Sequence, residues 1–225
     1  MTTPHTTPDA AQLAQLDTFS GFSVALIADA LDRLGRRDQV MSDRIAQLSG
    51  GDILAGYAVT VSVGASFEGS PTPYDKEMEA IELLREGCVL VAATNGPPAA
   101  FWGELLTERA STLGARGAIV DGYARDLKQI RERGFPVWAC GTNAADSAGR
   151  LEAYHVGGAV MCAGVLVRAG DLIVADCDGV IAVPYELVDQ VRALVVEKQT
   201  AEDAVRRELA SGSTMQAVYA KYGVL

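Results

Sequence analysis

The stretch that decides the fold is AIVDGYARD, residues 118–126, in which an apolar run ends in an aspartate, a glycine and a short loop. The run Ala118-Ile119-Val120 is typical of a short buried strand. The loop that follows carries Arg125 and Asp126 side by side. Because ligands in α/β sheets gather at loops that follow the carboxyl ends of strands, the pattern predicts a binding site at these two residues.

A second stretch, WGELL at residues 102–106, would face the same site from the start of a helix. The backbone N–H groups of Leu105 and Leu106 would have no partner within that helix and could hold an anion. Arg125 can grip a carboxylate through two parallel hydrogen bonds. The oxygens of Asp126 suit Mg²⁺ or Mn²⁺. Together these residues indicate a site for an anionic substrate and a hard divalent cation.

Each of these residues also has a purely structural interpretation. Asp126 and Gln129 fit a capping box, in which the aspartate would satisfy the start of the next helix. Arg125 could pair with a surface carboxylate, and the two leucines of WGELL could belong to the core. Glu104 would be a second carboxylate that acts on the metal through water, or it could serve only the positive end of the helix dipole. The sequence leaves both interpretations open.

Other catalytic patterns are weak in this chain. His155, at a predicted strand start, is more typical of a structural residue than of a catalytic base. The sequence contains neither a phosphate-binding loop nor a dinucleotide fingerprint after a strand. Lys128 and Lys198 fall at predicted exposed helix positions, which disfavours a Schiff-base mechanism. A carbon–carbon lyase built on this chain would therefore depend on a metal.

Length and composition are those of an ordinary globular protein. The 225 residues fit one domain, which we expect to span residues 11–225 behind a disordered tail at residues 1–10. A net charge of −10 disfavours a nucleic-acid partner, since such a partner requires a basic surface. The four cysteines form no C-x-x-C pair, and the sequence has no signal-peptide pattern and no apolar run of membrane length. These features predict a reduced, cytoplasmic protein without membrane contact.

The periodicity of apolar residues predicts a mixed α/β fold with part parallel and part antiparallel sheet. Predicted helices span residues 20–34, 74–86, 100–113, 126–133, 185–209 and 213–222. Predicted strands span residues 53–63, 88–94, 118–120, 135–140, 155–167 and 172–183. The last of these would fold back on itself at residues 176–179, and residues 141–154 would be irregular. Residues 185–225 would form a helical extension.

Several segments resemble one known family, in the same order along the chain. They are SVALIADAL (23–31), AGYAVTV (55–61), WGELL (102–106), GARG (114–117) with VDGYARD (120–126), GFPV (134–137), and GD (170–171) with DCDGVIAVP (176–184). On these segments the chain resembles the RraA-like family. That family joins the regulators of ribonuclease activity A to the 4-hydroxy-4-methyl-2-oxoglutarate / 4-carboxy-4-hydroxy-2-oxoadipate aldolases.

The resemblance implies a fold and an assembly. The fold would be a ββα swivelling-domain sandwich with a mixed sheet, N-terminal helices and a C-terminal helical extension. The assembly would be a homotrimer or a dimer of trimers, with sites between subunits. A glutamate from the C-terminal helix of the adjacent subunit would complete each site, with Glu202 the best match and Glu197 the weaker one.

The resemblance also implies roles for the residues of the two stretches. Arg125 would bind the carboxylate and the keto oxygen of a pyruvyl unit. The segment Gly103 to Leu106 would hold the same carboxylate, through the amides of Leu105 and Leu106. Asp126 would ligate Mg²⁺ or Mn²⁺ directly, while the glutamate of WGELL would hold a water on the metal.

The expected function is that of a divalent-metal-dependent lyase, which cleaves a 4-hydroxy-2-oxo acid to pyruvate and decarboxylates oxaloacetate as a side activity. Two alternatives stay open: a non-catalytic regulator that binds a ribonuclease or another protein, and a lyase for an unrelated oxo acid. The chain departs from the family at Glu104, where an aspartate is usual, and at Tyr123-Ala124, where Ala-Val is usual. Residues 64–75 fit no aldolase pattern, which leaves the identity of the oxo acid open.

Overall fold

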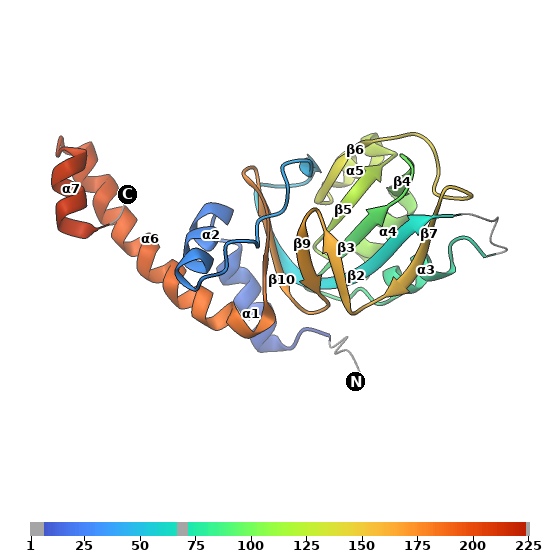
Figure 1. The fold of residues 1–225 in the computed structure, drawn as a ribbon, viewed down its shortest axis with the longest axis horizontal. Coiled ribbons are helices and arrows are strands. Elements are labelled where there is room, and N and C mark those ends of the chain that lie inside the picture. Colours follow the sequence, from blue (N-terminus) through green and yellow to red (C-terminus); the bar gives the residue numbers. More distant parts are fainter. Residues whose placement is uncertain (1–6, 67–71, 224–225) are drawn as a thin grey trace.

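The structure is a computed structural model that describes residues 7–66 and 72–223. It has the mixed α/β architecture that the sequence predicts. A curved sheet carries helices, and a long C-terminal helix runs away from the body of the protein (Figure 1). Residues 1–6 of the predicted tail lie outside the described residues, and the first helix, α1 (Ala10–Phe19), begins where that tail was predicted to end.

Nine strands form one sheet among the described residues. In order across the sheet they are β1 (Ala46–Ser49), β6 (Val137–Thr142), β5 (Gly117–Ala124), β3 (Cys88–Asn95), β2 (Leu54–Ala65), β10 (Leu172–Asp176) and β11 (Gly179–Val183). Two more strands pair beside this path: β4 (Ala100–Trp102) with β5, and β7 (Leu151–Val156) with β2. Strands β2, β3, β5 and β6 are mutually parallel, and β1 and β10 flank them antiparallel.

The central strands are apolar on both faces because both faces are covered. Along β3, Leu90 belongs to a core under three helices, whereas Val89 and Val91 belong to a core under a separate hairpin. The helices are α3 (Asp75–Glu82), α4 (Glu104–Thr112) and α5 (Leu127–Arg133). The hairpin is β8 (Ala159–Cys162) and β9 (Val165–Arg168). Two fully buried tryptophans, Trp102 and Trp138, mark these two cores.

A third core lies between one edge of the sheet and the helices from the two ends of the chain. Here α2 (Val24–Arg33) packs against β11 and α6 (Val188–Ala210), which follows the 3₁₀ turn η1 (Tyr185–Leu187). The outer part of α6 leaves the body of the protein, and α7 (Met215–Tyr222) folds back on it (Figure 1). The predicted helices at residues 185–209 and 213–222 are confirmed.

In the described part of the chain, no helix has both the length and the apolar character that crossing a membrane requires.

The sequence predicted most of the strands correctly but misplaced three segments. The strands at residues 53–63, 88–94 and 172–183 are confirmed, including the turn within the last one. Residues 100–102 were predicted as helix but form β4, because they pair with β5. Residues 155–167 were predicted as one strand but contain the end of β7 and the hairpin β8–β9, since glycines 157, 158 and 164 adopt positive φ angles at the turns. β7 itself begins inside the region predicted to be irregular.

Helix α3 is shorter than the predicted helix 74–86, and of the apolar side predicted for that helix, Met78, Ile81 and Leu84, only the first residue is exposed. Met78 was expected on the apolar side but is 53% exposed. Ile81 and Leu84 are buried as predicted, and Glu77 and Ala80 complete the buried stripe, at the spacing i, i+3, i+4 and i+7 counted from Glu77. The helix therefore carries one carboxyl group into the body of the protein.

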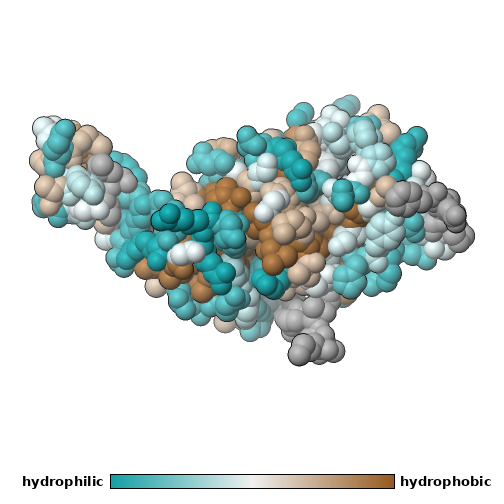
Figure 2. Space-filling view, in the orientation of Figure 1, coloured by the Kyte–Doolittle hydropathy of each residue, from teal (hydrophilic) through white to brown (hydrophobic). Residues whose placement is uncertain are grey.

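One surface of the fold is apolar. Figure 2 shows hydrophobic residues gathered at the centre of the visible face, over the region of β9 and β10. The exposed large apolar side chains include Met161 and Leu166 of the hairpin β8–β9, and Val40, which bridges to β11. Contiguous apolar surface of this kind is typical of a contact with another molecule.

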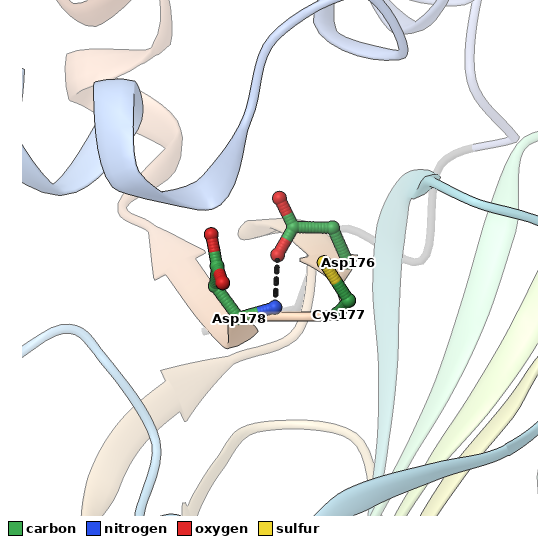
Figure 3. Close-up of side chains that lie close together, drawn as sticks. All are labelled: Asp176, Cys177 and Asp178. Atoms are coloured by element: carbon green, nitrogen blue, oxygen red, sulfur yellow. Dashed lines mark hydrogen bonds between the residues drawn. The ribbon is translucent and has the colours of Figure 1, made fainter.

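Asp176, at the turn between β10 and β11, joins the sheet to the helical layer (Figure 3). Its Oδ2 atom accepts a hydrogen bond of 2.8 Å from the N–H of Val24, the first residue of α2. Its Oδ1 atom accepts one of 2.9 Å from the N–H of Asp178. Its backbone carbonyl accepts a third, of 3.2 Å, from the indole N–H of Trp138 on β6. One buried residue thus connects three elements.

Replacing Asp176 with alanine would remove both carboxylate acceptors and leave the buried N–H of Val24 unpaired. We expect Asp176→Ala to lower the free energy of unfolding by about 2 kcal/mol. Urea unfolding followed by circular dichroism measures this change. The matched control is Asp178→Ala, at an exposed position of the same turn, where the expected loss is below about 0.5 kcal/mol. Equal losses in the two variants would contradict the assigned role.

Candidate functional site

The predicted site forms where β4 and β5 end side by side. The two strands are parallel, with Ala100 opposite Tyr123 and Trp102 opposite Ala124. Just beyond this ladder, the N–H of Arg125 donates to the carbonyl of Trp102 at 2.9 Å. The pairing places the start of α4 directly against the loop after β5. The two stretches singled out in the sequence therefore meet.

Gly103, between β4 and α4, allows this close approach. A Cβ atom at this position would lie 3.1 Å from Oδ2 of Asp126 and 3.4 Å from Cγ of Arg125. The next residue, Glu104, donates its backbone N–H to the same Asp126 oxygen at 3.4 Å. A larger residue at position 103 would have to displace these side chains. Gly103 thus contributes to the site by having no side chain of its own.

The first turn of α4 presents free backbone N–H groups. The helix begins its own hydrogen bonding with the N–H of Thr107, which donates to the carbonyl of Gly103 at 3.1 Å. Within the part of the chain that the structure describes, the N–H groups of Leu105 and Leu106 have no acceptor. Leu105 is 76% exposed, so the interpretation that it belongs to the core is wrong, whereas Leu106 packs partly against the core.

Asp126 stands at the N-cap position of α5, but its side chain does not cap that helix. The capping box that the spacing to Gln129 allowed is therefore not formed. The backbone of Asp126 lies in the left-handed region, with a φ of 58°. This conformation costs a non-glycine residue roughly 1–2 kcal/mol. Strained residues of this kind cluster at binding and catalytic sites, which favours the functional interpretation of Asp126.

Arg125 lies between two carboxylates. Its Nε atom is 3.6 Å from Oδ2 of Asp126, and its Nη2 atom is 3.3 Å from Oδ1 of Asp146. The other oxygen of Asp146 accepts a hydrogen bond of 2.6 Å from the hydroxyl of Tyr74. The side chain of Arg125 is still 37% exposed. Both carboxylates that pair with Arg125 thus belong to the pocket, and the guanidinium remains accessible to a ligand.

The sequence analysis missed one wall of the pocket, which consists of Tyr74, Glu77, Asp146 and Ser147 and is called the α3 wall below. Burial, together with the negative charge of Asp146, raises the pKa of Glu77 to about 7, although Ser147 and Arg125 act in the opposite direction. Burial would also raise the pKa of Asp146, but the hydrogen bond from Tyr74 and the charge of Arg125 keep it below its ordinary value. One feature of the sequence could have indicated this wall: Glu77 falls on the same helix face as the apolar residues of α3.

The pocket as a whole is a cavity of about 320 Å³, at the small end of the range for sites that bind small molecules. Its described lining contains a single cationic side chain, Arg125. Four carboxyl groups face the same space: Glu77, Glu104, Asp126 and Asp146. Negative charge therefore dominates the protein groups, and an anionic substrate would require an added cation.

The two glutamates predicted to come from an adjacent subunit lie far from this pocket in their own chain, on α6 (Figure 1). Glu202 is 3.6 Å from Lys198, which also pairs with Asp29, and Glu197 is 3.4 Å from Arg33. Both thus lie in the helical layer formed by α2 and α6. Their role at the site of another subunit stays a prediction.

A second group of ligand-type side chains, Asp176, Cys177 and Asp178, sits at the β10–β11 turn (Figure 3). Both oxygens of Asp176 already accept backbone N–H groups, from Val24 and Asp178. A metal at this turn would have to replace those two hydrogen bonds, and the other two side chains are exposed. The group fits a structural turn better than a metal site. Asp126 and Glu104 are the better candidates for metal ligands.

Fold and site together define a class: a mixed α/β protein whose pocket sets the free amides of a helix start against an arginine–aspartate pair. Comparison of the sequence with known families gives the family. The chain belongs to the RraA-like family, described as Aldolase/RraA, whose model matches residues 24–182. The family predicted from the sequence segments is thereby confirmed.

Individual relatives cover the chain to different extents. A Halalkalibacterium halodurans protein, provisionally named a 4-hydroxy-4-methyl-2-oxoglutarate aldolase, is 31% identical over 206 residues, which are 91% of this chain and 92% of that protein. Protein DlpA of Legionella pneumophila is 29% identical over 193 residues, but this chain spans only 31% of its length. A Streptomyces coelicolor structure, described as an unusual member of the RNase ES inhibitor RraA protein family, has a TM-score of 0.77 at 27% identity, covering 89% of this chain and 98% of that one.

The raised pKa of Glu77 makes the stability of the protein depend on pH. The folded protein keeps the proton of this carboxyl up to about pH 7, whereas an unfolded chain releases it near the ordinary value of 4.5. The folded state thus binds more protons in this window, so stability falls as the pH rises through it. We expect a loss of the order of 1–3 kcal/mol from this group, and we expect Glu77→Gln to remove it.

Urea unfolding at a series of pH values between the two pKa values, and just above them, measures this dependence. The matched control is Glu79→Gln, on the exposed face of the same helix, where Glu79 pairs with Lys76. The control should keep the pH dependence of the original protein. If Glu77→Gln and Glu79→Gln give the same profile, Glu77 does not titrate as described.

Proposed function

We propose that the protein is a divalent-metal-dependent lyase, which cleaves a 4-hydroxy-2-oxo acid to pyruvate and a second carbonyl compound. One observation carries the proposal: Arg125 and Asp126 meet the free amides of Leu105 and Leu106 in a single pocket. Membership of the Aldolase/RraA family and the name of the Halalkalibacterium halodurans relative support an aldolase. A small-molecule substrate follows from the same comparison and agrees with the size of the pocket.

The donor atoms of the pocket suit a hard divalent cation, Mg²⁺ or Mn²⁺. Both ions prefer carboxylate and water oxygens as ligands. Asp126 would ligate the ion directly, since the contacts of its Oδ2 among the described residues are long ones, with Arg125 at 3.6 Å and the amide of Glu104 at 3.4 Å. Glu104 would act through a water molecule. A divalent cation would also offset the excess of carboxyl groups in the lining, which an anionic substrate otherwise meets.

Each residue of the pocket has its own role in the proposed reaction. Arg125 binds the carboxylate and the keto oxygen of the substrate, and the amides of Leu105 and Leu106 bind the carboxylate from the other side. A bound metal would supply a Lewis acid for the keto group. The C3–C4 bond then breaks, its electron pair forms the enolate of pyruvate, and C4 becomes a carbonyl. Glu104 and the Glu202 of an adjacent subunit are the candidates for accepting the proton of the 4-hydroxyl group.

Two further properties belong to this proposal. Decarboxylation of oxaloacetate leaves the same pyruvate enolate, so we expect it as a side activity. A homotrimer or a dimer of trimers would bring α6 of one subunit to the pocket of another. The apolar surface around β9 and β10 supports such a contact (Figure 2), as do the exposed Met161 and Leu166.

A non-catalytic regulator that binds a ribonuclease is the second candidate. It is favoured by the similarity to the Streptomyces coelicolor protein, whose description names an RNase ES inhibitor family. A regulator needs a surface but no pocket. Capture of a ribonuclease that persists in Arg125→Ala, together with absent lyase activity, would favour the regulator.

The lyase proposal predicts pyruvate release from 4-hydroxy-2-oxo acids and from oxaloacetate, with Mg²⁺ or Mn²⁺ present and not with a chelator. Arg125→Ala removes the group that holds both the carboxylate and the keto oxygen, so we expect kcat/KM to fall at least about 100-fold. Asp126→Asn should cause a similar fall and raise the metal concentration needed for half-maximal rate. A coupled lactate dehydrogenase assay measures pyruvate.

Asp178→Asn is the matched control, because it neutralises an exposed aspartate outside the pocket. Its kcat/KM should equal that of the original protein. Absence of pyruvate from every 2-oxo acid tested, at high enzyme concentration with metal, would contradict the proposal.

A further inference from the structure

We infer that the substrate carries a neutral, hydroxyl-bearing tail beyond C4, as a 2-oxo-3-deoxy sugar acid does, and not a second carboxylate. This inference rests on the proposed lyase function and specifies the substrate class of the same pocket. It comes from the α3 wall of Tyr74, Glu77, Asp146 and Ser147. None of these four residues belongs to the segments on which the chain resembles its family.

The positive groups of the pocket are already assigned when the pyruvyl half of a substrate is bound. Arg125 and the amides of Leu105 and Leu106 hold its carboxylate and keto oxygen. Asp126 and Glu104 hold the metal. Within one chain, the part of the lining that remains for the rest of the substrate is the α3 wall, with Met78 and Phe101 beside it.

The α3 wall repels a second carboxylate. Glu77 and Asp146 both face this space, and within the described lining no cation other than Arg125 balances them. Glu77 is 9% exposed, so little water screens its charge. Burial, and after it the charge of Asp146, raises the pKa of Glu77 to about 7, so Asp146 carries the charge of the wall at neutral pH and Glu77 adds its own above that pH. A dicarboxylate substrate would add a third negative charge at this place.

The same wall suits hydroxyl groups. Carboxyl oxygens accept hydrogen bonds from alcohols, and the hydroxyls of Tyr74 and Ser147, which donate to Asp146, keep lone pairs that can accept from a ligand. Tyr74 is held in place by its 2.6 Å hydrogen bond to Asp146, so these groups are oriented before a ligand enters. A plain apolar tail would cover these polar groups without bonding to them, which adds discrimination against such a tail.

The reaction balances with such a substrate. The C3–C4 bond of a 4-hydroxy-2-oxo sugar acid breaks, and its electron pair becomes the pyruvate enolate. The proton of the 4-hydroxyl leaves, and C4 becomes the aldehyde of a neutral hydroxyaldehyde. A proton then adds to C3 of the enolate to give pyruvate, so no oxidant, reductant or further reactant is needed.

The test compares two substrates that share the pyruvyl half. One is 2-oxo-3-deoxygluconate, with a neutral polyol tail, and the other is 4-hydroxy-4-methyl-2-oxoglutarate, with a second carboxylate. At saturating Mg²⁺ and about pH 8, above the raised pKa of Glu77, we expect kcat/KM for pyruvate release to be at least about 10-fold higher for the neutral tail. Glu77→Gln and Asp146→Asn each remove a charge from the α3 wall and should reduce that ratio by about 10-fold, through a rise in activity on the dicarboxylate.

Glu79→Gln, on the exposed face of α3, is the matched control and should leave the ratio unchanged. A higher kcat/KM for the dicarboxylate in the original protein would overturn the inference while leaving the lyase function intact. A ratio that is the same in Glu77→Gln, Asp146→Asn and the original protein would also overturn it. No pyruvate from either substrate, nor from oxaloacetate, would instead contradict the proposed function, and the inference with it.

Discussion

The short parallel pairing of β4 with β5 is the interaction on which the rest of the site depends. It continues past the end of β5 in the hydrogen bond from the N–H of Arg125 to the carbonyl of Trp102, the last residue of β4. Because that bond fixes the spacing of two loop ends, the amides of α4 and the side chains of Arg125 and Asp126 share one cavity. Gly103 favours this arrangement, since a Cβ atom at this position would lie only 3.1 Å from Oδ2 of Asp126 and would push the carboxylate aside. A strand of three residues thus positions groups from two different strand–helix units.

Several residues of the site have conformations or positions that lower the stability of the folded protein. Asp126 adopts a backbone conformation that favours glycine, and it does so without capping its helix. Glu77 occupies a buried helix position that an apolar residue would fill at lower cost. Four carboxyl groups share a small cavity with one guanidinium. Functional sites commonly lower the stability of a protein in this way. A bound cation would offset most of the repulsion among the four carboxyl groups.

Sequence reasoning recovered the parts of the molecule that depend on local patterns. The apolar strands, the hairpin at residues 172–183 and the two C-terminal helices follow from periodicity and turn residues, and the adjacency of Arg125 and Asp126 is a matter of chain order. It failed where the outcome depends on contacts between distant segments. Residues 100–102 look helical until β5 is available to pair with them. The α3 wall joins Glu77 to Asp146, which lie 69 positions apart by their numbering and have no motif in common.

The long helix α6 determines where local unfolding of the protein begins. Its first part packs Val188, Val191 and Val195 into the core shared with α1 and α2, whereas its outer part buries Val205 in the segment on which α7 folds back. At 1.5 Å per residue, its 23 residues span about 35 Å, so the far end lies well outside the body. A helical pair with so small a core is marginal in water. In a subunit outside the proposed assembly, amide hydrogen exchange should thus be graded along α6, fastest at the tip and slowest beside the sheet, and the chain would fray from this end before its strands separate.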